Sequence, residues 1–215
     1  MVAMFEELEK IVIALEKTSQ QSSLVSEFLE KISRIIINIE QTTDSETILT
    51  LITFVERVLA VVPENKQLQT LYGQIVLNTL PILFVQLPLL QIKAIINNFR
   101  AFADKMTSDI LTEFLGMILV NSIYDFSLKN HAASINEFAT ELIDLSRKHP
   151  TNEKVQTACA KGLFNATQFL LQQKDRTAAR NFYRQLKTIL ETRLEKEVVD
   201  SRQLLKLKEV FEEKD

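Results

Sequence analysis

The sequence predicts an all-α fold, an α-α superhelix (solenoid) of about five stacked helical hairpins with a right-handed course. Three observations support this prediction. Glycine and proline are scarce, with 3 and 4 residues among 215, and 46% of the residues are apolar, a composition that favours helices over tight β-turns. Apolar residues recur at helical spacing. A short pattern also recurs at the period of stacked helical repeats.

The recurring pattern is a small residue, a variable residue, usually two or three apolar residues and then asparagine. Its four copies end at Asn38, Asn78, Asn121 and Asn165, which are 40, 43 and 44 residues apart. Proline stands 15 residues before Asn78 and again 15 residues before Asn165, so the turn repeats together with the helix. We therefore expect a single helical-repeat domain over residues 1–215. Its repeats are predicted at about 1–44, 45–87, 88–130, 131–174 and 175–215.

Each repeat is predicted to contain two amphipathic helices. Their apolar stripes span 5–15 and 24–39, then 48–59 and a segment from about 66, then 92–102 and 110–119, then 135–145 and 155–169, and finally 182–190 and 204–211. Pro81 should end or kink the second helix of the second repeat, because proline removes a backbone donor. Pro88 should start the next helix at about Leu89. The small residue of each pattern should let the paired helix approach closely.

Residues 67–92 contain no charged side chain. They include five glutamines and two prolines, which are unusual in a lipid-facing helix. We expect this segment to be the covered middle of the stack and not a membrane span. The opening residues lack the features of a signal peptide. Cys159 is the only cysteine, which is typical of a reducing compartment, so we expect a cytoplasmic location.

The net charge of −3 provides no global basic field that would attract nucleic acid. The charge is nevertheless uneven, with ten acids and five bases in residues 1–60 but thirteen acids and sixteen bases in residues 126–215. Near the C-terminus, Arg176, Arg180, Arg184 and Lys187 lie at helical spacing. This possible basic docking stripe could meet an acidic partner or a phosphate backbone. The alternative is an ordinary solvated helix face.

The segment 152–166 resembles the last helix of an armadillo repeat. The residues that match that helix in register are Val155, Gln156, Ala160, Leu163 and Asn165. In armadillo proteins a series of asparagines holds the backbone of an extended peptide along a concave groove, so the resemblance implies peptide capture. The positions that carry tryptophan in that family are occupied here by Arg34, Gln74, Met117 and Lys161. Hairpins of this length also resemble HEAT and tetratricopeptide arrays.

These features favour a non-enzymatic scaffold that binds a protein or an extended peptide on the concave face of the array. The predicted contact residues are Asn38, Asn78, Asn121, Asn165, Gln74 and Lys161. The asparagines could instead be structural, each satisfying polar groups buried between repeats. We expect no catalytic, cofactor-binding or metal-binding residues, because the two histidines have no partners at ligand spacing and the three glycines are isolated.

Two other function classes stay open. The first is a HEAT-repeat-type nucleic-acid-binding protein or DNA glycosylase, which a pI of about 5.6 and the lack of tryptophan disfavour. The second is a structural homo-oligomer that uses the uncharged residues 67–92 as its interface. The oligomeric state and the partner cannot be read from the sequence.

Overall fold

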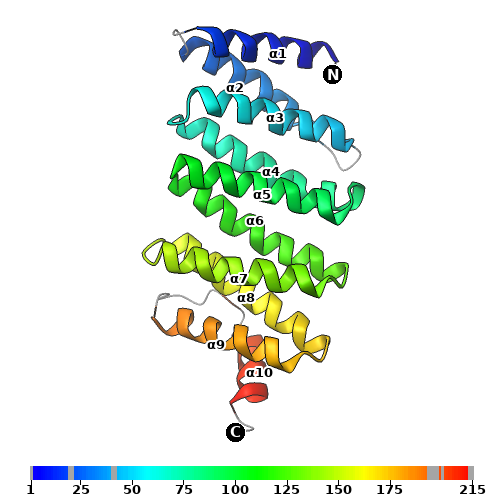
Figure 1. Ribbon diagram of the computed structural model, residues 1–215, viewed down its shortest axis with the longest axis vertical. Coiled ribbons are helices and arrows are strands. Elements are labelled where there is room, and N and C mark those ends of the chain that lie inside the picture. Colours follow the sequence, from blue (N-terminus) through cyan, green and yellow to red (C-terminus); the bar gives the residue numbers. More distant parts are fainter. Residues whose placement is uncertain (1, 19–21, 40–42, 193–198, 200, 213–215) are drawn as a thin grey trace. The chain divides into compact units, whose positions relative to one another are not determined.

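The computed structural model describes residues 2–18, 22–39, 43–192, 199 and 201–212. The structure is 87% helical, and the described residues form ten helices and no strand (Figure 1), which confirms the all-α prediction. The helices are α1 (Val2–Lys17), α2 (Ser22–Ile36), α3 (Ser45–Val61), α4 (Lys66–Gln86), α5 (Leu89–Met106), α6 (Asp109–Leu128), α7 (Ala132–Lys148), α8 (Glu153–Gln172), α9 (Arg176–Thr192) and α10 (Ser201–Phe211). Residues 193–198 and 200 of the predicted fifth repeat lie outside the described residues.

The chain divides into two compact units, and the division falls inside α6. Unit 1 is Met1–Phe114 and unit 2 is Leu115–Asp215. In unit 1, α1 packs against α2 and α3, α3 packs against α4, and α4 contacts α5 (Figure 1). In unit 2, α8 packs against both α7 and α9, and α7 also contacts α9. Helix α10 meets α9 through the stacked rings of Tyr183 and Phe211, whose centroids are 5.0 Å apart.

Aromatic side chains occupy the centre of each unit. In unit 1 the ring of Tyr72 stacks on Phe99 at 4.8 Å, and the Tyr72 hydroxyl donates a hydrogen bond of 2.6 Å to Glu56. In unit 2 the rings of Phe126 and Phe138 lie 5.4 Å apart. Phe99 and Phe138 fall on the predicted apolar stripes, whereas Phe126 lies beyond the stripe predicted at 110–119. Burial of apolar side chains is the main source of helix stability in a globular protein.

The turn between α3 and α4 is held by two side-chain amides. Asn65 caps α4, since its carbonyl oxygen accepts a hydrogen bond of 3.0 Å from the backbone N–H of Leu68. Gln69 then donates a hydrogen bond of 2.7 Å to the carbonyl of Pro63. The side chain of Gln69 is buried, and this hydrogen bond satisfies its amide donor as well as the turn carbonyl.

The turn between α7 and α8 has the same construction. Asn152 accepts a hydrogen bond of 3.1 Å from the N–H of Val155, and Gln156 donates to the carbonyls of Ser146 and His149 at 2.8 and 2.9 Å. The residues that end the preceding helices also match. Val62 has φ −127° and ψ 64°, and His149 has φ −123° and ψ 61°. Corresponding positions of the two turns are 87 residues apart, which is two predicted repeats.

A second pair of equivalent loops follows α6 and α8. Asn130 and Lys174 both adopt a left-handed backbone conformation, with φ of 54° and 63°. The next residue in each loop bonds back to the helix, His131 N–H to Phe126 at 3.0 Å and Asp175 N–H to Leu170 at 2.9 Å. A left-handed residue followed by this bond is a common way to end a helix. The loops are 44 residues apart, one predicted repeat.

Pro81 lies inside α4, which continues to Gln86. Of the two predicted outcomes, an end of the helix at Pro81 is therefore wrong, and a kink there stays a prediction. Proline removes the hydrogen bond to the carbonyl of residue 77, but Pro81 is exposed and Leu77 is only half-buried. Water can reach that side of the helix, so the unpaired carbonyl costs little. The start of the next helix at Leu89, with Pro88 at its N-cap, agrees with the prediction.

Candidate functional site

The repeated asparagines do not lie in the protein core. Asn78 on α4 and Asn121 on α6 are exposed, and Asn165 on α8 is half-buried. The side chains of these three residues form no hydrogen bond with any residue that the structure describes. The structural alternative required amides that satisfy buried groups between repeats. In all three, the amide instead keeps its donors and acceptor available for another molecule.

Asn38 differs from the other three. It is exposed and lies in the turn after α2, which ends at Ile36, so its predicted place on a helix face is wrong. Its amide donates a hydrogen bond of 2.7 Å to the carbonyl of Arg34. The last carbonyls of a helix have no partner within the helix, and Asn38 satisfies one of them. Asn38 therefore has a local structural role.

The variable residue four positions before each asparagine lies on the same exposed surface. Arg34, Gln74 and Lys161 are exposed, and Met117 is 37% exposed. Residues four apart on a helix share a face, so α4, α6 and α8 each present a pair made of this residue and the asparagine. On α4 the pair is Gln74 and Asn78, and on α8 it is Lys161 and Asn165.

Helix α6 adds apolar side chains to this face. Tyr124 and Leu128 are 56% and 66% exposed, and they continue the stripe begun by Met117 and Asn121. The sequence reasoning missed both residues. Their spacing could have predicted this exposed stripe, because residues 117, 121, 124 and 128 fall on one side of the helix. The buried Ile118, Ile123 and Phe126 fall on another side.

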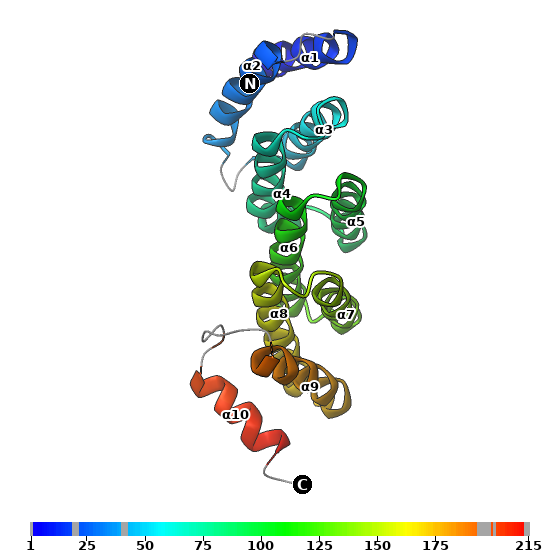
Figure 2. The same cartoon turned by 90° about the vertical axis from the view of Figure 1, so that its left-hand side faces the viewer.

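In unit 2 this stripe of α6 has α8 beside it (Figure 2). A methyl group at Gly162 of α8 would lie 3.3 Å from Ile123 and 3.5 Å from Val120, both on α6. The exposed face of α6 and the face with Lys161 and Asn165 therefore belong to neighbouring helices. Figure 2 also shows α10, whose Gln203 accepts a hydrogen bond of 2.8 Å from Gln168 of α8.

Small residues on the opposite side of the second helices allow close packing, although not with the predicted partner. A methyl group at Gly73 of α4 would overlap the ring of Phe114 on α6. A methyl group at Gly116 would lie 3.1 Å from the side chain of Ala158 on α8. These contacts are with the second helix of the next hairpin, not with the paired helix. At Gly73 and Gly116 the small residue thus faces inward and the asparagine, five positions later, faces outward, whereas Ser33 of α2 is exposed.

Buried hydroxyl groups next to the asparagines are satisfied within their own helices. Thr79, Ser122 and Thr167 each donate a hydrogen bond of 2.7 Å to the carbonyl four residues earlier. These three hydroxyl groups therefore need no polar partner from a neighbouring helix.

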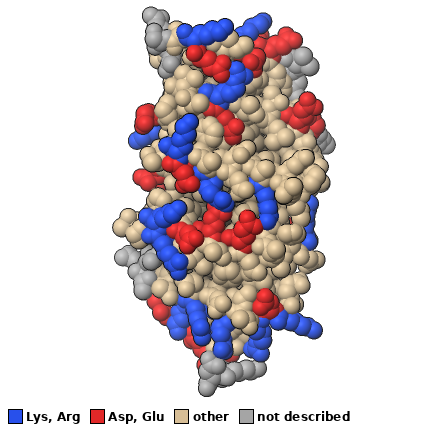
Figure 3. Space-filling view, viewed as in Figure 1, with Lys and Arg blue, Asp and Glu red and all other residues tan. Residues whose placement is uncertain are grey.

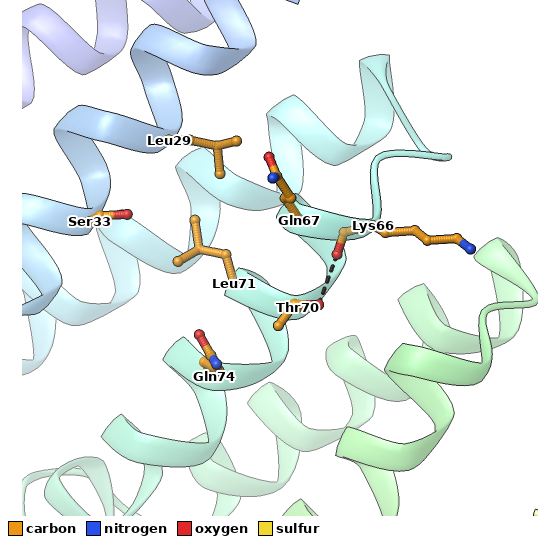
Figure 4. Close-up of a pocket in the computed structure, with 7 residues that line it drawn as sticks. All are labelled: Leu29, Ser33, Lys66, Gln67, Thr70, Leu71 and Gln74. Carbon is orange, nitrogen blue, oxygen red and sulfur yellow. Dashed lines mark hydrogen bonds between the residues drawn. The ribbon is translucent and has the colours of Figure 1, made fainter.

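Unit 1 has a shallow pocket between α2 and α4, of about 450 Å³ (Figure 4). Its lining residues are Leu29, Ser33, Lys66, Gln67, Thr70, Leu71 and Gln74. Figure 4 shows Leu29 and Leu71 projecting toward the same space, with the polar groups of Ser33 and Gln74 at its edge. The pocket combines a small apolar floor with amide and hydroxyl groups.

The basic stripe divides into two parts in the structure. Arg176, Arg180 and Arg184 line a second pocket, between α9 and α10. Lys187 is directed to Glu212, with its ammonium 3.0 Å from the carboxylate. This contact raises the pKa of Lys187, and the bonds from Tyr183 and Lys187 lower the pKa of Glu212. Lys187 therefore stabilises the contact between α9 and α10, while the three arginines face the pocket.

The described residues bear on two other properties, metal binding and membrane insertion. No group of three or more His, Cys, Asp or Glu side chains in them could hold a metal ion. By length and composition alone, α4 and α6 could each cross a membrane, but helices in the core of a soluble protein meet the same criterion. In this structure 56% of the apolar window of α4 and 50% of that of α6 are buried within the protein.

Comparison with protein-family models, curated protein sequences and solved structures found no match for this chain.

Proposed function

We propose that the helical hairpins stack as a solenoid and that the chain is a non-enzymatic, armadillo-like scaffold that binds an extended peptide. The peptide-binding surface is the exposed side of the second helices, which is the concave face of the proposed array. The repetition of the same turn at an 87-residue interval supports the stacked arrangement, because stacked repeats place equivalent turns in equivalent surroundings.

The observation that carries the peptide proposal is the environment of Asn121 and Asn165. Both amides lack a hydrogen-bonding partner among the described residues, and they lie on the adjacent helices α6 and α8. A side-chain amide has both donors and an acceptor, so it can pair with the N–H and carbonyl of an extended backbone. The exposed side chains of Met117, Tyr124 and Leu128 provide apolar contact area around Asn121.

The experiment starts from peptides selected from a random library displayed on phage. Synthetic copies of the selected peptides are titrated against wild type and against a variant that carries Asn121→Ala and Asn165→Ala. We expect the affinity to fall about tenfold or more, because each amide contributes hydrogen bonds worth about 0.5 to 1.5 kcal/mol. N-methylation of the peptide backbone should produce a similar loss.

The matched control carries Asn97→Ala and Asn98→Ala, which removes two exposed amides from α5, a first helix. This control should bind as wild type does. Both variants should unfold within about 0.5 kcal/mol of wild type, since exposed substitutions are usually neutral. Equal affinity of the N121A/N165A variant and wild type for every selected peptide would contradict the proposed binding surface.

A further inference from the structure

The pocket between α2 and α4 in unit 1 has a lining with little charge. Its volume is about 450 Å³, and Lys66 is the one charged residue among the seven that line it. Figure 4 shows the Lys66 ammonium directed away from the space between the two helices. By contrast, Figure 3 shows acidic and basic side chains intermixed on the face of the protein that it displays. A ligand of this pocket should be uncharged where it meets the lining, because a charge that leaves water without a partner costs free energy.

Two leucines from different helices form the floor of the pocket. Leu29 of α2 and Leu71 of α4 are both half-buried, and Figure 4 shows their side chains projecting into the same space. Each leucine therefore keeps part of its apolar surface in contact with water. An apolar side chain placed between them would remove that surface from water, which is the main favourable contribution to most protein associations.

Polar side chains flank the two leucines. Gln67 and Gln74 are exposed on α4, and Ser33 is exposed on α2. The side chains of these three residues form no hydrogen bond with any residue that the structure describes. Thr70 differs, because its hydroxyl donates a hydrogen bond of 2.9 Å to the carbonyl of Lys66 in the same helix. Amide and hydroxyl groups both donate and accept, so the two glutamines and the serine can pair with a peptide backbone.

The spacing of the two glutamines matches an extended peptide. Residues 67 and 74 are seven positions apart, which is about 10.5 Å along a helix, and Leu71 lies between them on the same side of α4 (Figure 4). Three residues of an extended chain cover about 10 Å, and their side chains point alternately to opposite faces. The backbone polar groups of successive residues point to opposite edges of such a chain.

A peptide that lies along α4 can therefore meet all of these groups at once. Its backbone bonds to Gln67 and Gln74 along one edge and to Ser33 along the other. The side chain between the two glutamines then points to the floor formed by Leu29 and Leu71.

We propose that this pocket binds one uncharged, leucine-sized side chain of an extended partner peptide, whose backbone pairs with Gln67, Gln74 and Ser33. This inference rests on the peptide-binding function proposed above and names a side-chain specificity of the same surface, because Gln74 shares a face of α4 with Asn78. A carboxylate at that position of the peptide would lose its hydration against the leucines without gaining a partner.

The test uses peptides of about 12 residues that are selected on wild type from a random library displayed on phage. Each selected peptide is synthesised with a fluorescein label, together with versions in which each large apolar residue is replaced by serine or by aspartate. Fluorescence anisotropy measures the affinities. The blocking variant is Ser33→Tyr, which adds a ring at the edge of the pocket. The matched control is Thr53→Tyr, which adds the same ring at an exposed position of α3, a first helix. Urea unfolding verifies that both variants fold, as expected for exposed substitutions.

We expect each tight-binding peptide to contain one large apolar residue whose replacement by serine lowers the affinity for wild type and T53Y by about tenfold or more. The same replacement should lower the affinity for S33Y by less than about threefold, because the blocked pocket no longer buries that side chain. Aspartate at this position should bind more weakly than serine. The Q67A/Q74A variant should bind the parent peptide about tenfold more weakly or worse. Gln91→Ala, which removes an exposed amide from α5, should not change the affinity.

The outcomes separate this inference from the proposed function. If serine replacement has the same effect on S33Y as on wild type, or if tight-binding peptides lack a large apolar residue, the pocket assignment is wrong and the peptide-binding function stands. If S33Y loses binding and N121A/N165A does not, the pocket stands and the surface on α6 and α8 is wrong. If wild type selects no peptide, both are wrong. A wild-type dimer in light scattering that S33Y converts to a monomer would show that a second copy occupies the pocket, which would overturn the inference.

Discussion

Gln69 and Gln156 perform the same task in two turns that lie 87 residues apart in the chain. Each is buried, with 6% and 1% of its surface exposed, and each donates its amide to carbonyls of the turn that precedes its helix. Each also accepts a hydrogen bond of 2.7 Å from a serine hydroxyl, Ser108 for Gln69 and Ser146 for Gln156. Because a buried amide must satisfy both its donors and its acceptor, these glutamines hold each turn against the start of the helix that follows it.

The replacement of Gln156 by alanine should destabilise unit 2 strongly. It removes three hydrogen bonds, to the hydroxyl and carbonyl of Ser146 and to the carbonyl of His149. Loss of partners for buried polar groups costs about 1 to 3 kcal/mol per group, so we expect a loss of about 2 to 4 kcal/mol in the free energy of unfolding. Urea unfolding followed by circular dichroism measures this free energy of unfolding. The exposed Gln172→Ala on the same helix should change it by less than about 0.5 kcal/mol. Similar values for the two variants would contradict the assigned role.

The helices could be predicted from the sequence because their apolar residues recur with the helical period. The division into five repeats, which rests on the period of the asparagines, stays a prediction. The direction of the asparagines could not be predicted. Asn78 and a buried amide such as Gln69 look alike in sequence, and only the packing of the neighbouring helices leaves one exposed and covers the other. The close approach of Gly73 to Phe114 could not be predicted for the same reason, because Phe114 lies 41 residues later in the chain.

The pocket between α9 and α10 could not be predicted from the sequence, because it depends on how two separate helices pack. The helical spacing of Arg176, Arg180 and Arg184 indicated a shared face. Whether such a face is solvated depends on α10, whose position no local pattern specifies. Of the two outcomes predicted at Pro81, an end of the helix was wrong, because the effect of a proline depends on whether solvent reaches the unpaired carbonyl.

Alanine substitutions at Gly73 and Gly116 should differ in their effect on stability, because the two sites leave different amounts of space for a methyl group. A methyl group at Gly73 would overlap the aromatic ring of Phe114, whereas one at Gly116 would lie 3.1 Å from the Ala158 methyl group and need only a small adjustment. Alanine in a helix gains about 1 kcal/mol over glycine, but overpacking costs about 1 to 3 kcal/mol or more. We expect Gly73→Ala to be destabilised by about 1 to 2 kcal/mol and Gly116→Ala to stay within about 1 kcal/mol of wild type. Thermal unfolding of both variants provides the comparison, and a more stable G73A protein would show that the Phe114 ring moves freely.

The contact between α1 and α3 should depend on pH and salt. Arg57 of α3 bonds to Glu9 and Glu16 of α1 at 2.9 Å each, and the hydrogen bond from Arg57 lowers the pKa of Glu16 below its ordinary value of 4.5. A carboxyl group with a lowered pKa stabilises the fold above its ordinary pKa, and this contribution is lost as the pH falls through its pKa in the folded state. We therefore expect Arg57→Met to lower the melting temperature at pH 7 in low salt.

The difference in melting temperature between Arg57→Met and wild type should shrink at pH 3. It should also shrink at pH 7 in about 1 M NaCl, where the screening length is about 3 Å. Arg147→Met, which removes an exposed arginine 3.5 Å from Asp144 on the same helix, is the control. A difference that is the same under all three conditions would mean that the side chain of Arg57 acts by packing and not by charge.

The pair of Glu56 and Tyr72 should show the opposite dependence on pH. Burial raises the pKa of Glu56 above its ordinary value of 4.5, and the hydrogen bond from Tyr72 opposes this only in part. Because the folded state holds the proton more tightly than the unfolded state does, the stabilising contribution is complete below the ordinary pKa and is lost as the pH rises through the raised pKa.

Glutamine at position 56 can still accept the Tyr72 hydrogen bond but carries no charge. Glu56→Gln should therefore be more stable than wild type at pH 7, and this advantage should disappear near pH 4. Urea unfolding at both pH values tests it, with the exposed Glu64→Gln as a control. A lower stability of E56Q at pH 7 would show that the ionised carboxylate contributes more through Tyr72 than its burial costs.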